Sequence, residues 1–462
     1  MATYSVVKTE PPASLDDVLA GRLGSIAVRG LAREPLRHGV GELLDQCLSG
    51  APAGALVLQR TKYKPGRKLT AYYSMSPKPG AVARHLAVRW HAAPNPIEPV
   101  RVEAQAEDRG GSDGFACHAA TSGDGRVALL VSPADPSMPQ LQRLHRRGHL
   151  AGLLAVNGRR ASPSIRLDID TIRYRPGERH VLRVTFGDPS SVAFVKTDRD
   201  DAGAHSVSIA TALGAALPGR CAGAGVAEPV RYVADDRAAI WRCAPGRPLR
   251  RRLLERPAEG PALLSLLGRA VRAIHDDADH VAATLTGDVR AVLPRDGYAE
   301  AALTLRAGEH IAALLPSAGR VYEGLVSDVV RDLDRWSPEA PTLTHGDLKC
   351  DNVIAADGQI RLLDFDRSCL ADPALDLGKL VADLRWWSPA RGRRGDELVA
   401  AFRSGYGPCD DARWRRAALL ATLFQLKLAA RRCAVHDERW ESAVQDRIGA
   451  AAAGLARQRA HG

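Results

Sequence analysis

The sequence lacks the features that would assign it to a membrane, secreted or metal-clip class. Its longest apolar run near the C-terminus, residues 417–424, is far shorter than the roughly 20 residues of a membrane span. The N-terminus has no charged-then-apolar secretory pattern. The eight cysteines include no C-x-x-C pair, so free thiols are expected. These absences predict a cytoplasmic protein with no membrane partner.

Aromatic residues are also few, at 5% of the chain, and lysine is scarce beside arginine. The formal net charge is +11, but the arginines are scattered and form no basic block interleaved with aromatics. A nucleic-acid groove would need such a block, so we expect no nucleic-acid partner. The 45% apolar and 25% charged fractions are those of a globular protein, and 462 residues exceed a single core, which predicts two or three domains.

The stretch that organises the chain has two parts, LTHGDLKCDNV at 343–353 and IRLLDFD at 360–366. Asp347, Lys349 and Asn352 lie in the first part, and Asp364 closes the short apolar strand of the second. The Asp-Gly pair at 357–358 is the signal of a tight hairpin turn. A hairpin of this length brings Asn352 and Asp364 to one end, near Asp347.

Phosphoryl transfer requires such a set of side chains. A carboxylate must orient the attacking hydroxyl and accept its proton, and a lysine can neutralise charge on the transferring group. Mg²⁺ prefers oxygen ligands and takes few of them from protein, so one amide and one carboxylate are a natural pair. The alternative is a plain hairpin whose turn acids are solvated, which gives no reason for these residues to occur together.

The two motifs resemble those of the aminoglycoside phosphotransferase and choline-kinase-like family, whose members share the protein-kinase fold. The shared pattern is His-Gly-Asp, four residues, Asn, and then an apolar strand ending in Asp. The resemblance implies that Asp347 is the catalytic base and that Asn352 and Asp364 bind Mg²⁺. Lys349 matches the lysine of the catalytic loop, and Asp366 is expected to play a supporting role. The implied cofactors are ATP and Mg²⁺.

A second pattern occurs twice. Residues 62–67, KYKPGR, match residues 173–178, RYRPGE, and each lies between two strand-like runs. The same order of basic, Tyr, basic, Pro and Gly in two hairpins predicts a partial internal duplication. The second copy continues into a strand that ends at Lys196, whereas the first has no comparable lysine. We therefore expect the first copy to bind no ATP.

By the resemblance, the second copy begins the nucleotide lobe. Lys196 then matches the lysine that pairs with the α- and β-phosphates, and the Pro176-Gly177 turn lies over the phosphates. Arg242 and Cys243 precede a Pro-Gly linker and are expected to line the adenine edge through their main chain. For Lys196, the alternative is an edge-strand lysine that faces water.

The chain departs from the family pattern in the helix that follows. The family's lysine usually pairs with a glutamate there, but the helix candidate at 204–214 contains no acid. Either Asp198, Asp200 or Asp201 takes that place, or another group holds the lysine. The departure keeps a pseudokinase open as an interpretation.

Together these patterns predict an α+β protein of the bilobal, protein-kinase-like fold, with a small antiparallel-sheet nucleotide lobe and a mainly helical second lobe. The predicted divisions are an extra N-terminal α+β domain that is a degenerate copy of the nucleotide lobe at 1–158, the nucleotide lobe at 159–245, and the helical lobe at 246–462 with its catalytic loop at 343–366. Asp376, near the start of a later helix, is expected to brace that loop.

The predicted function is transfer of a phosphoryl group from ATP to a hydroxyl of a small molecule, such as a sugar, an amino alcohol or an aminoglycoside-like compound. The helical lobe carries more arginine than acid, particularly after Arg391, so a neutral or anionic acceptor fits at least as well as a cationic antibiotic. The alternative is a catalytically weak pseudokinase or a scaffold protein. A protein kinase is disfavoured, because no Ala-Pro-Glu-type segment follows Asp364.

Overall fold

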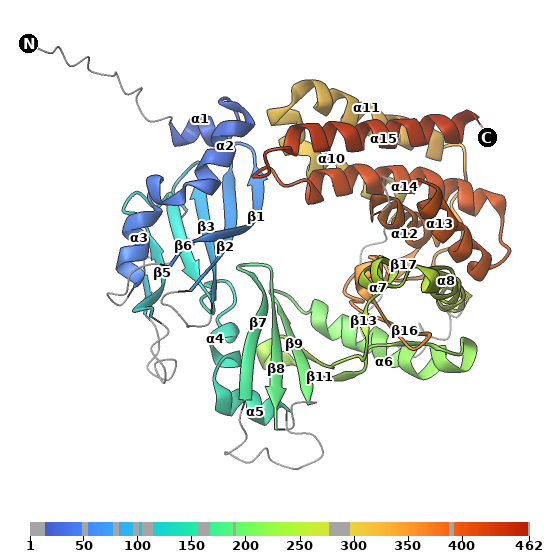
Figure 1. The fold of residues 1–462 in the computed structure, drawn as a ribbon, viewed down its shortest axis with the longest axis horizontal. Helices are drawn as coiled ribbons and strands as arrows, with labels where there is room; N and C mark the ends of the chain where they lie inside the picture. The colour runs from blue at the N-terminus through green and yellow to red at the C-terminus, as the bar shows by residue number, and fades with distance from the viewer. Residues whose placement is uncertain are drawn as a thin grey trace, which may run out of the picture.

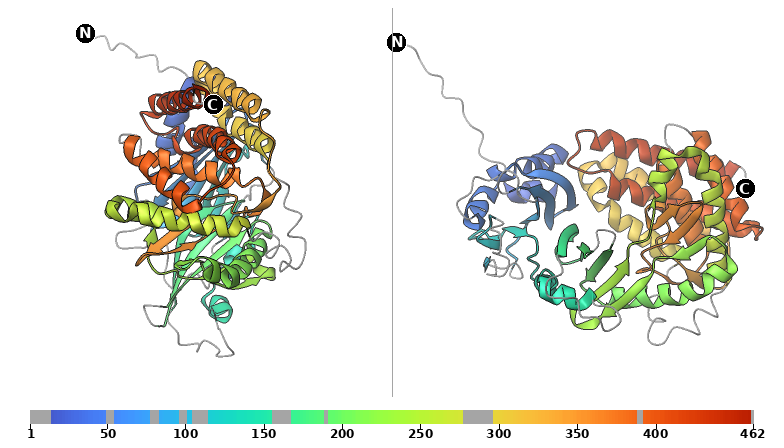
Figure 2. Two further views of the ribbon diagram at one scale, coloured as in Figure 1. Left: turned by 90° about the vertical axis from the view of Figure 1, so that its right-hand side faces the viewer. Right: turned by 60° about the horizontal axis from the view of Figure 1, so that its bottom comes forward.

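The computed structural model describes residues 14–48, 54–76, 83–95, 101–103, 114–154, 167–187, 191–276, 296–387 and 392–460. The chain forms three parts: an N-terminal sheet with its helices, a second sheet, and a helical part. Figure 1 shows them in blue to cyan, green, and yellow to red, and Figure 2 shows the same arrangement from two further sides. Each part contacts the other two.

The N-terminal part is an antiparallel sheet packed against short helices. Its strands, in the order β1-β2-β3-β6-β5-β4, are β1 (Val57–Lys64), β2 (Lys68–Met75), β3 (Arg84–His91), β4 (Arg101–Glu103), β5 (Cys117–Thr121) and β6 (Val127–Val131), and its helices are α1 (Leu15–Ala20), α2 (Gly24–Arg33) and α3 (Val40–Cys47). Leu69 and Tyr73 alternate along β2 toward one face, where they join a buried cluster with Leu31 and Leu43 of the helices. The alternation explains why one face of this sheet carries the helices.

The second sheet is also antiparallel. Its strands, in the order β11-β12-β9-β8-β7, are β7 (Leu167–Arg175), β8 (Arg179–Phe186), β9 (Val192–Asp198), β11 (Pro229–Val233) and β12 (Ala238–Arg242), and the neighbouring helices are α4 (Gln140–Leu144), α5 (Arg147–Leu154) and α6 (Ala202–Arg220). Leu182 and Val195 form a buried cluster with Leu150 and Leu154 of α5. The predicted boundary at 158/159 lies outside the described residues, and α5, which precedes it, packs on the second sheet.

The two sheets share one strand order. The order β1-β2-β3-β6-β5 corresponds to β7-β8-β9-β12-β11, and every neighbouring pair is antiparallel in both. The similarity between the two hairpins therefore extends to the order and direction of five strands. The helix α6 lies between the third and fourth strands of the second copy, whereas the described residues between β3 and β5 include no helix.

The remaining chain is mainly helical and contains the catalytic hairpin. Its elements are α7 (Leu249–Glu255), α8 (Gly260–Asp276), α10 (Gly297–Leu314), α11 (Pro316–Leu333), α12 (Ala374–Trp387), α13 (Gly392–Tyr406), α14 (Asp411–Arg432) and α15 (Trp440–Ala460), with the strands β10 (Ala224–Val226), β13 (Arg247–Pro248), β14 (Thr342–Thr344), β15 (Val353–Ala356), β16 (Gln359–Leu362) and β17 (Cys369–Ala371). The predicted hairpin is confirmed as β15–β16. Because β10 pairs with β16 in parallel, this small sheet joins the two lobes. None of the described helices has the length and apolarity to cross a bilayer.

The N-terminal part is attached to both other parts by side-chain contacts. Toward the second sheet it forms the ion pair Lys62–Glu178, while the pair Arg143–Asp236 attaches α4 to that sheet. Toward the helical part it forms the ion pairs Arg33–Glu438 and Arg67–Glu309 and the hydrogen bonds Ser25–Glu441 and Thr61–His436. Exposed pairs of this kind contribute about 0–1 kcal/mol each, so the placement of this part depends on their number.

Lys427 and Glu300 form an ion pair inside the helical part, where their side chains are 4% and 2% exposed. Burial lowers the pKa of Lys427 to about 8 against the pull of Glu300, so the ammonium of Lys427 is charged at pH 7. Lys427→Met removes this cation from the buried Glu300 side chain, and we expect it to lower the free energy of unfolding by about 3–5 kcal/mol. The double variant Lys427→Met/Glu300→Met should recover most of that loss in denaturant unfolding. An equal loss in both variants would contradict the role of the pair.

Candidate active site

One buried carboxylate holds the catalytic loop in place. Asp376 of α12 accepts the N–H groups of His345 (2.6 Å) and Gly346 (2.9 Å) and lies 3.4 Å from Nε2 of His275. Gly346 has a φ of 73°, and a Cβ there would overlap the carbonyl of Arg367, so this corner requires glycine. The contacts agree with the bracing role predicted for Asp376.

Asp347 lies next to this corner between two lysines. Lys349 donates to its Oδ2, and the Nζ of Lys379 from α12 lies 3.4 Å from its Oδ1. Burial alone would raise the pKa of Asp347, but the charges of Lys379 and Lys349 hold it well below its ordinary value. The Nδ2 of Asn352 donates to the Asp347 carbonyl (3.0 Å). The structure thus brings three predicted residues together and adds Lys379, which no motif indicated.

Two carboxylates after β16 face two cations of the second sheet. Lys196 donates to Oδ1 of Asp364 (2.7 Å) and to Asp366. Arg179 pairs with Asp366 and lies 3.7 Å from Oδ1 of Asp364. Burial, followed by the charge of Asp364, raises the pKa of Asp366 to about 6. Burial would likewise raise the pKa of Asp364, but the charge of Lys196 keeps it well below its ordinary value.

The carboxylate pair fits a hard divalent cation. Asp364 has a φ of 67°, a left-handed conformation that is costly for a non-glycine residue and is found mostly at functional sites. The Oδ1 of Asp366 is buried and has no hydrogen-bond partner within the described part of the chain. Asn352 lies beside them, since its carbonyl accepts the N–H of Leu363 (2.9 Å). Two carboxylates and one amide oxygen are the ligand types that Mg²⁺ prefers.

Among the described residues of its own lobe, none gives Lys196 an acidic partner. The three acids proposed as substitutes have other partners: Asp198 pairs with Arg179, Asp200 accepts the Ala202 N–H, and Asp201 accepts the Tyr232 hydroxyl. In α6, the Nε2–H of His205 donates to the Ser368 carbonyl, two residues after Asp366 (2.7 Å). Another group therefore holds the lysine, as the second alternative from the sequence proposed: Asp364 and Asp366 of the other lobe contact Lys196.

Besides Lys379, Arg179 is a site residue that the sequence motifs did not indicate. It pairs in register with Asp198, and Val181 pairs with Lys196, so Arg179 and Lys196 lie on the same face of the sheet. The available signal was the position of Arg179 directly after the Pro-Gly-Glu turn. A basic residue, Lys68, occupies the same place in the first copy.

The Pro176-Gly177 turn is bonded to the N-terminal part. The Gly177 N–H donates to Oδ2 of Asp135 (2.7 Å), and Arg89 donates to the Pro176 carbonyl (2.7 Å). Asp135 also lies 2.8 Å from Nε2 of His180, and both side chains are 1% exposed. This turn, predicted to lie over phosphates, therefore has its glycine N–H engaged by a buried carboxylate.

Arg89 corresponds in register to Lys196. Arg89 pairs with Thr70 of β2, and Lys196 pairs with Val181 of β8. Thr70 and Val181 are at the same distance along the chain from their turn glycines. The first copy therefore carries a cation at the lysine position after all, and that cation binds the turn of the second copy.

Arg242 and Cys243 lie at the end of β12, where the lobes are joined. The Arg242 N–H donates to the Glu228 carbonyl (3.0 Å), and the Cys243 N–H donates to the Val192 carbonyl (3.2 Å). Donors to a base at this edge would therefore come from other main-chain groups of the linker.

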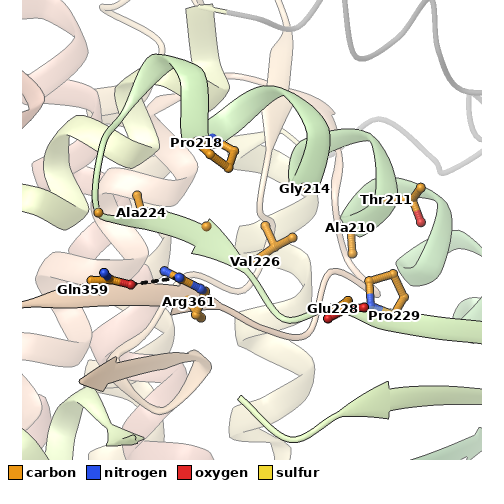
Figure 3. A pocket seen from close by; sticks show the side chains of 12 residues that line it. Ala210, Thr211, Gly214, Pro218, Ala224, Val226, Glu228, Pro229, Gln359 and Arg361 are labelled. Atoms are coloured by element: carbon orange, nitrogen blue, oxygen red, sulfur yellow. Dashed lines mark hydrogen bonds between the residues drawn. The ribbon is translucent and has the colours of Figure 1, made fainter. Parts of the chain in front are cut away.

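A surface cavity of about 510 Å³ lies away from these residues, between α6, β10 and β16. Figure 3 shows its two charged side chains, Arg361 and Glu228, at some remove from one another, with Arg361 bonded to Gln359 (2.9 Å). None of the residues predicted for catalysis or cofactor binding lines it. The cavity is therefore separate from the candidate active site.

Comparison with known proteins identifies the family. Residues 202–441 match the phosphotransferase enzyme family, APH, which is more than half of the chain. The chain belongs to this family. The match confirms the resemblance inferred from the two motifs and the kinase-like α+β fold class. Within the phosphotransferase-family match lie Asp347, Lys349, Asn352 and Asp364, whereas Lys196 and the Pro176-Gly177 turn precede it.

Solved structures similar to this phosphotransferase-family protein are distant in sequence. A choline/ethanolamine kinase family protein of Mesorhizobium loti is 16% identical, covering 62% of this chain and 88% of its own, with a TM-score of 0.43. An ethanolamine kinase of Plasmodium vivax is 15% identical, covering 68% and 86%, with a TM-score of 0.45. The GDP complex of aminoglycoside 2'-phosphotransferase-IIIa is 16% identical, covering 64% and 95%, with a TM-score of 0.45. No relative among the curated proteins matches the sequence.

Asp376 gives a test of the loop geometry that is independent of activity. Burial would raise its pKa, but the hydrogen bond from His275 and the N–H of His345 keep it below its ordinary value. We expect Asp376→Asn to lower the free energy of unfolding by about 2–3 kcal/mol at pH 7, because two N–H groups lose a charged acceptor. A depressed pKa contributes stability above the unfolded value, near 3.8, and loses it below, so wild type and variant should converge as the pH falls through that range.

The matched control is Asp396→Asn, since the Asp396 side chain is 71% exposed. Chemical denaturation at pH 7 and pH 3 measures both variants, and the control should differ from wild type by no more than about 0.5 kcal/mol. A loss for Asp376→Asn that persists unchanged at pH 3 would contradict the ionic role of this carboxylate.

Proposed function

We propose that this phosphotransferase-family protein transfers the γ-phosphoryl group of ATP, with Mg²⁺, to a hydroxyl of a small molecule. The observation that carries the proposal is that one site contains both an ionised Asp347 and a pair of carboxylates, Asp364 and Asp366, that contact Lys196 and Arg179. A base on one side and a cation–carboxylate cluster on the other are the two halves of a phosphoryl-transfer site.

Asp347 is proposed to orient the acceptor hydroxyl and take its proton. Its depressed pKa keeps it ionised at neutral pH, so it is ready to accept a hydrogen bond from the hydroxyl. A carboxylate this acidic is a weak base, so its main contribution is orientation of the hydroxyl before the proton is transferred late in the reaction. Lys349 and Lys379 would then neutralise charge on the transferring group, because both already lie against the Asp347 oxygens.

A bound Mg²⁺ would supply positive charge that offsets the charge of the nucleotide phosphates. Asn352, Asp364 and Asp366 are the residues proposed to hold it. Lys196 and Arg179, which now neutralise those two carboxylates, would turn to the phosphates of the nucleotide. The absence of a glutamate from the helix then does not prevent nucleotide binding, because Asp364 and Asp366 position the lysine.

The alternative is a pseudokinase or scaffold protein. It is favoured by one observation: the N–H groups of Gly177 and Cys243, predicted to face phosphate and adenine, are engaged within the protein. Nucleotide binding separates the two proposals, because a scaffold that binds no nucleotide shows neither Mg²⁺ dependence nor sensitivity to the carboxylates.

Nucleotide binding tests the proposed metal and phosphate groups. Wild type should bind ATP with Mg²⁺ at least tenfold more tightly than without it. Asp364→Asn should abolish that Mg²⁺ dependence, since it replaces a charged ligand by a neutral one. Fluorescent-nucleotide titration measures the dissociation constants, and Asp396→Asn serves again as the exposed control. A wild type that binds no nucleotide at millimolar concentration would refute the kinase proposal.

Asp347→Asn separates binding from chemistry. Removing the carboxylate should leave the affinity for Mg²⁺ and ATP within about threefold of wild type but lower kcat by about 10²–10⁴-fold, the usual contribution of a general base. Once an acceptor is known, radiolabelled phosphate transfer measures the loss. A variant that retains wild-type kcat would show that Asp347 does not act on the acceptor.

A further inference from the structure

More cationic side chains than carboxylates lie around Asp347. The cationic side chains near it are Lys349, Lys379, Lys427, Arg367 and Arg431, and the carboxylates among them are Asp347 and Glu300. The three lysines have partners, because Lys349 and Lys379 share Asp347 and Lys427 pairs with Glu300. The two arginines are therefore the surplus.

Arg367 is placed beside the catalytic corner by its backbone. An ideal Cβ on Gly346 would lie 3.1 Å from the Cβ of Arg367, so Arg367 packs against the residue that precedes Asp347. Arg367 is exposed and contributes a Coulombic pull that lowers the pKa of Asp347. Its guanidinium therefore extends from the rim of the site.

Arg431 reaches the same region from α14. Phe424, Lys427 and Arg431 are spaced three and four residues apart, which places them on one face of the helix. The ring of Phe424 lies 4.9 Å from the ammonium of Lys379, which in turn contacts Asp347. Burial, followed by the positive charge of Arg367, lowers the pKa of Arg431, so the two guanidinium groups are close enough to repel one another.

Neither arginine forms an ion pair of its own. Within the described ranges, Arg367 and Arg431 make no side-chain hydrogen bond or ion pair, and Asp347 and Glu300, which attract Arg431 at longer range, are already paired with lysines. Five cations held around two carboxylates raise the free energy of the empty site. An anionic ligand removes that cost when it binds.

The second sheet also carries positively charged side chains. Arg173 pairs in register with Val181, which pairs with Lys196, and Arg175 pairs with Arg179, so both arginines share the face of the sheet that carries Lys196 and Arg179. Burial, and then the charges of Arg60 and Arg173, lower the pKa of Arg175 to about 10. Lys196 and Arg179 already suffice for a nucleotide phosphate chain, so this further charge favours an anionic second substrate.

We infer that the acceptor carries an anionic group, a carboxylate, phosphate or sulfate, on the same molecule as the reacting hydroxyl, and that Arg367 and Arg431 bind this group. The inference rests on the proposed function. In the reaction the acceptor oxygen forms a bond to the γ-phosphorus, the bond from that phosphorus to ADP breaks, and the hydroxyl proton passes to Asp347. Guanidinium groups suit the role, because each presents paired N–H donors to two oxygens of an anion.

The first test uses an anion whose binding does not depend on the identity of the acceptor. Sulfate is titrated by isothermal calorimetry into protein saturated with Mg²⁺ and a non-hydrolysable ATP analogue, which fills the nucleotide site including its γ-phosphate. Wild type should bind sulfate, and Arg367→Gln/Arg431→Gln should bind it at least tenfold more weakly. The control Arg306→Gln/Arg439→Gln removes two exposed positive charges elsewhere and should bind sulfate as wild type does.

The second test measures phosphate transfer to acceptors of one carbon skeleton and different charge, for example galacturonate, galactose and galactosamine, and glycerate, glycerol and serinol. Anionic members should have the highest kcat/KM, and Arg367→Gln/Arg431→Gln should reduce that advantage at least tenfold while leaving neutral members unchanged. The inference is overturned if cationic or neutral members are preferred, or if sulfate binding is the same in wild type and Arg367→Gln/Arg431→Gln. If wild type does not bind the ATP analogue, the proposed function itself is rejected. Titration of the analogue alone measures this outcome separately from sulfate binding.

Discussion

The lobes of this phosphotransferase-family protein meet across four charges, and the candidate site depends on that meeting. Lys196 and Arg179 come from the second sheet, and Asp364 and Asp366 follow β16 of the helical part. The Lys196 and Asp366 side chains are 11% and 6% exposed, so removing one member of the set would leave its partner buried without a counter-charge, which is strongly unfavourable. A nucleotide with its cation would therefore exchange partners among charges that are already assembled, and the site is electrostatically prepared before any ligand arrives.

The part of the site that the sequence predicts is the part that is local in the chain. Asp347, Lys349, Asn352 and Asp364 lie within one loop and one hairpin, so their spacing alone brings them together, as the pairing of β15 with β16 shows. The kinase-like fold class followed from the same motifs and is confirmed by the family match. The repeated Tyr-x-Pro-Gly hairpin lies in two sheets of the same strand order, and this order extends over five strands, beyond the hairpin that the sequence pattern covers.

The remaining features depend on pairings between distant segments. Nothing near Arg179 in the sequence shows that it faces Asp366, and nothing near Lys379 shows that α12 carries it to Asp347. The sequence of the first copy has no lysine at the end of its third strand, which is why that copy was expected to bind no ATP. Register, which only the structure supplies, identifies Arg89 as the corresponding residue. Strand register is set by hydrophobic pattern and turn geometry together, and a one-residue error reverses which face a side chain occupies.

The contacts of the N-terminal part have a mechanical consequence. Two lobes on one hinge can swing apart freely, but three bodies joined in pairs form a closed linkage, in which no pair moves without loosening the third joint. The joint to the second sheet includes Asp135 and His180, each 1% exposed, whereas the joint to the helical part rests on pairs such as Arg67–Glu309, exposed by 60% and 48%. Exposed pairs are weak and are screened by salt. Salt therefore weakens the charged pairs between the N-terminal part and the helices more than it weakens the buried contacts between the N-terminal part and the second sheet.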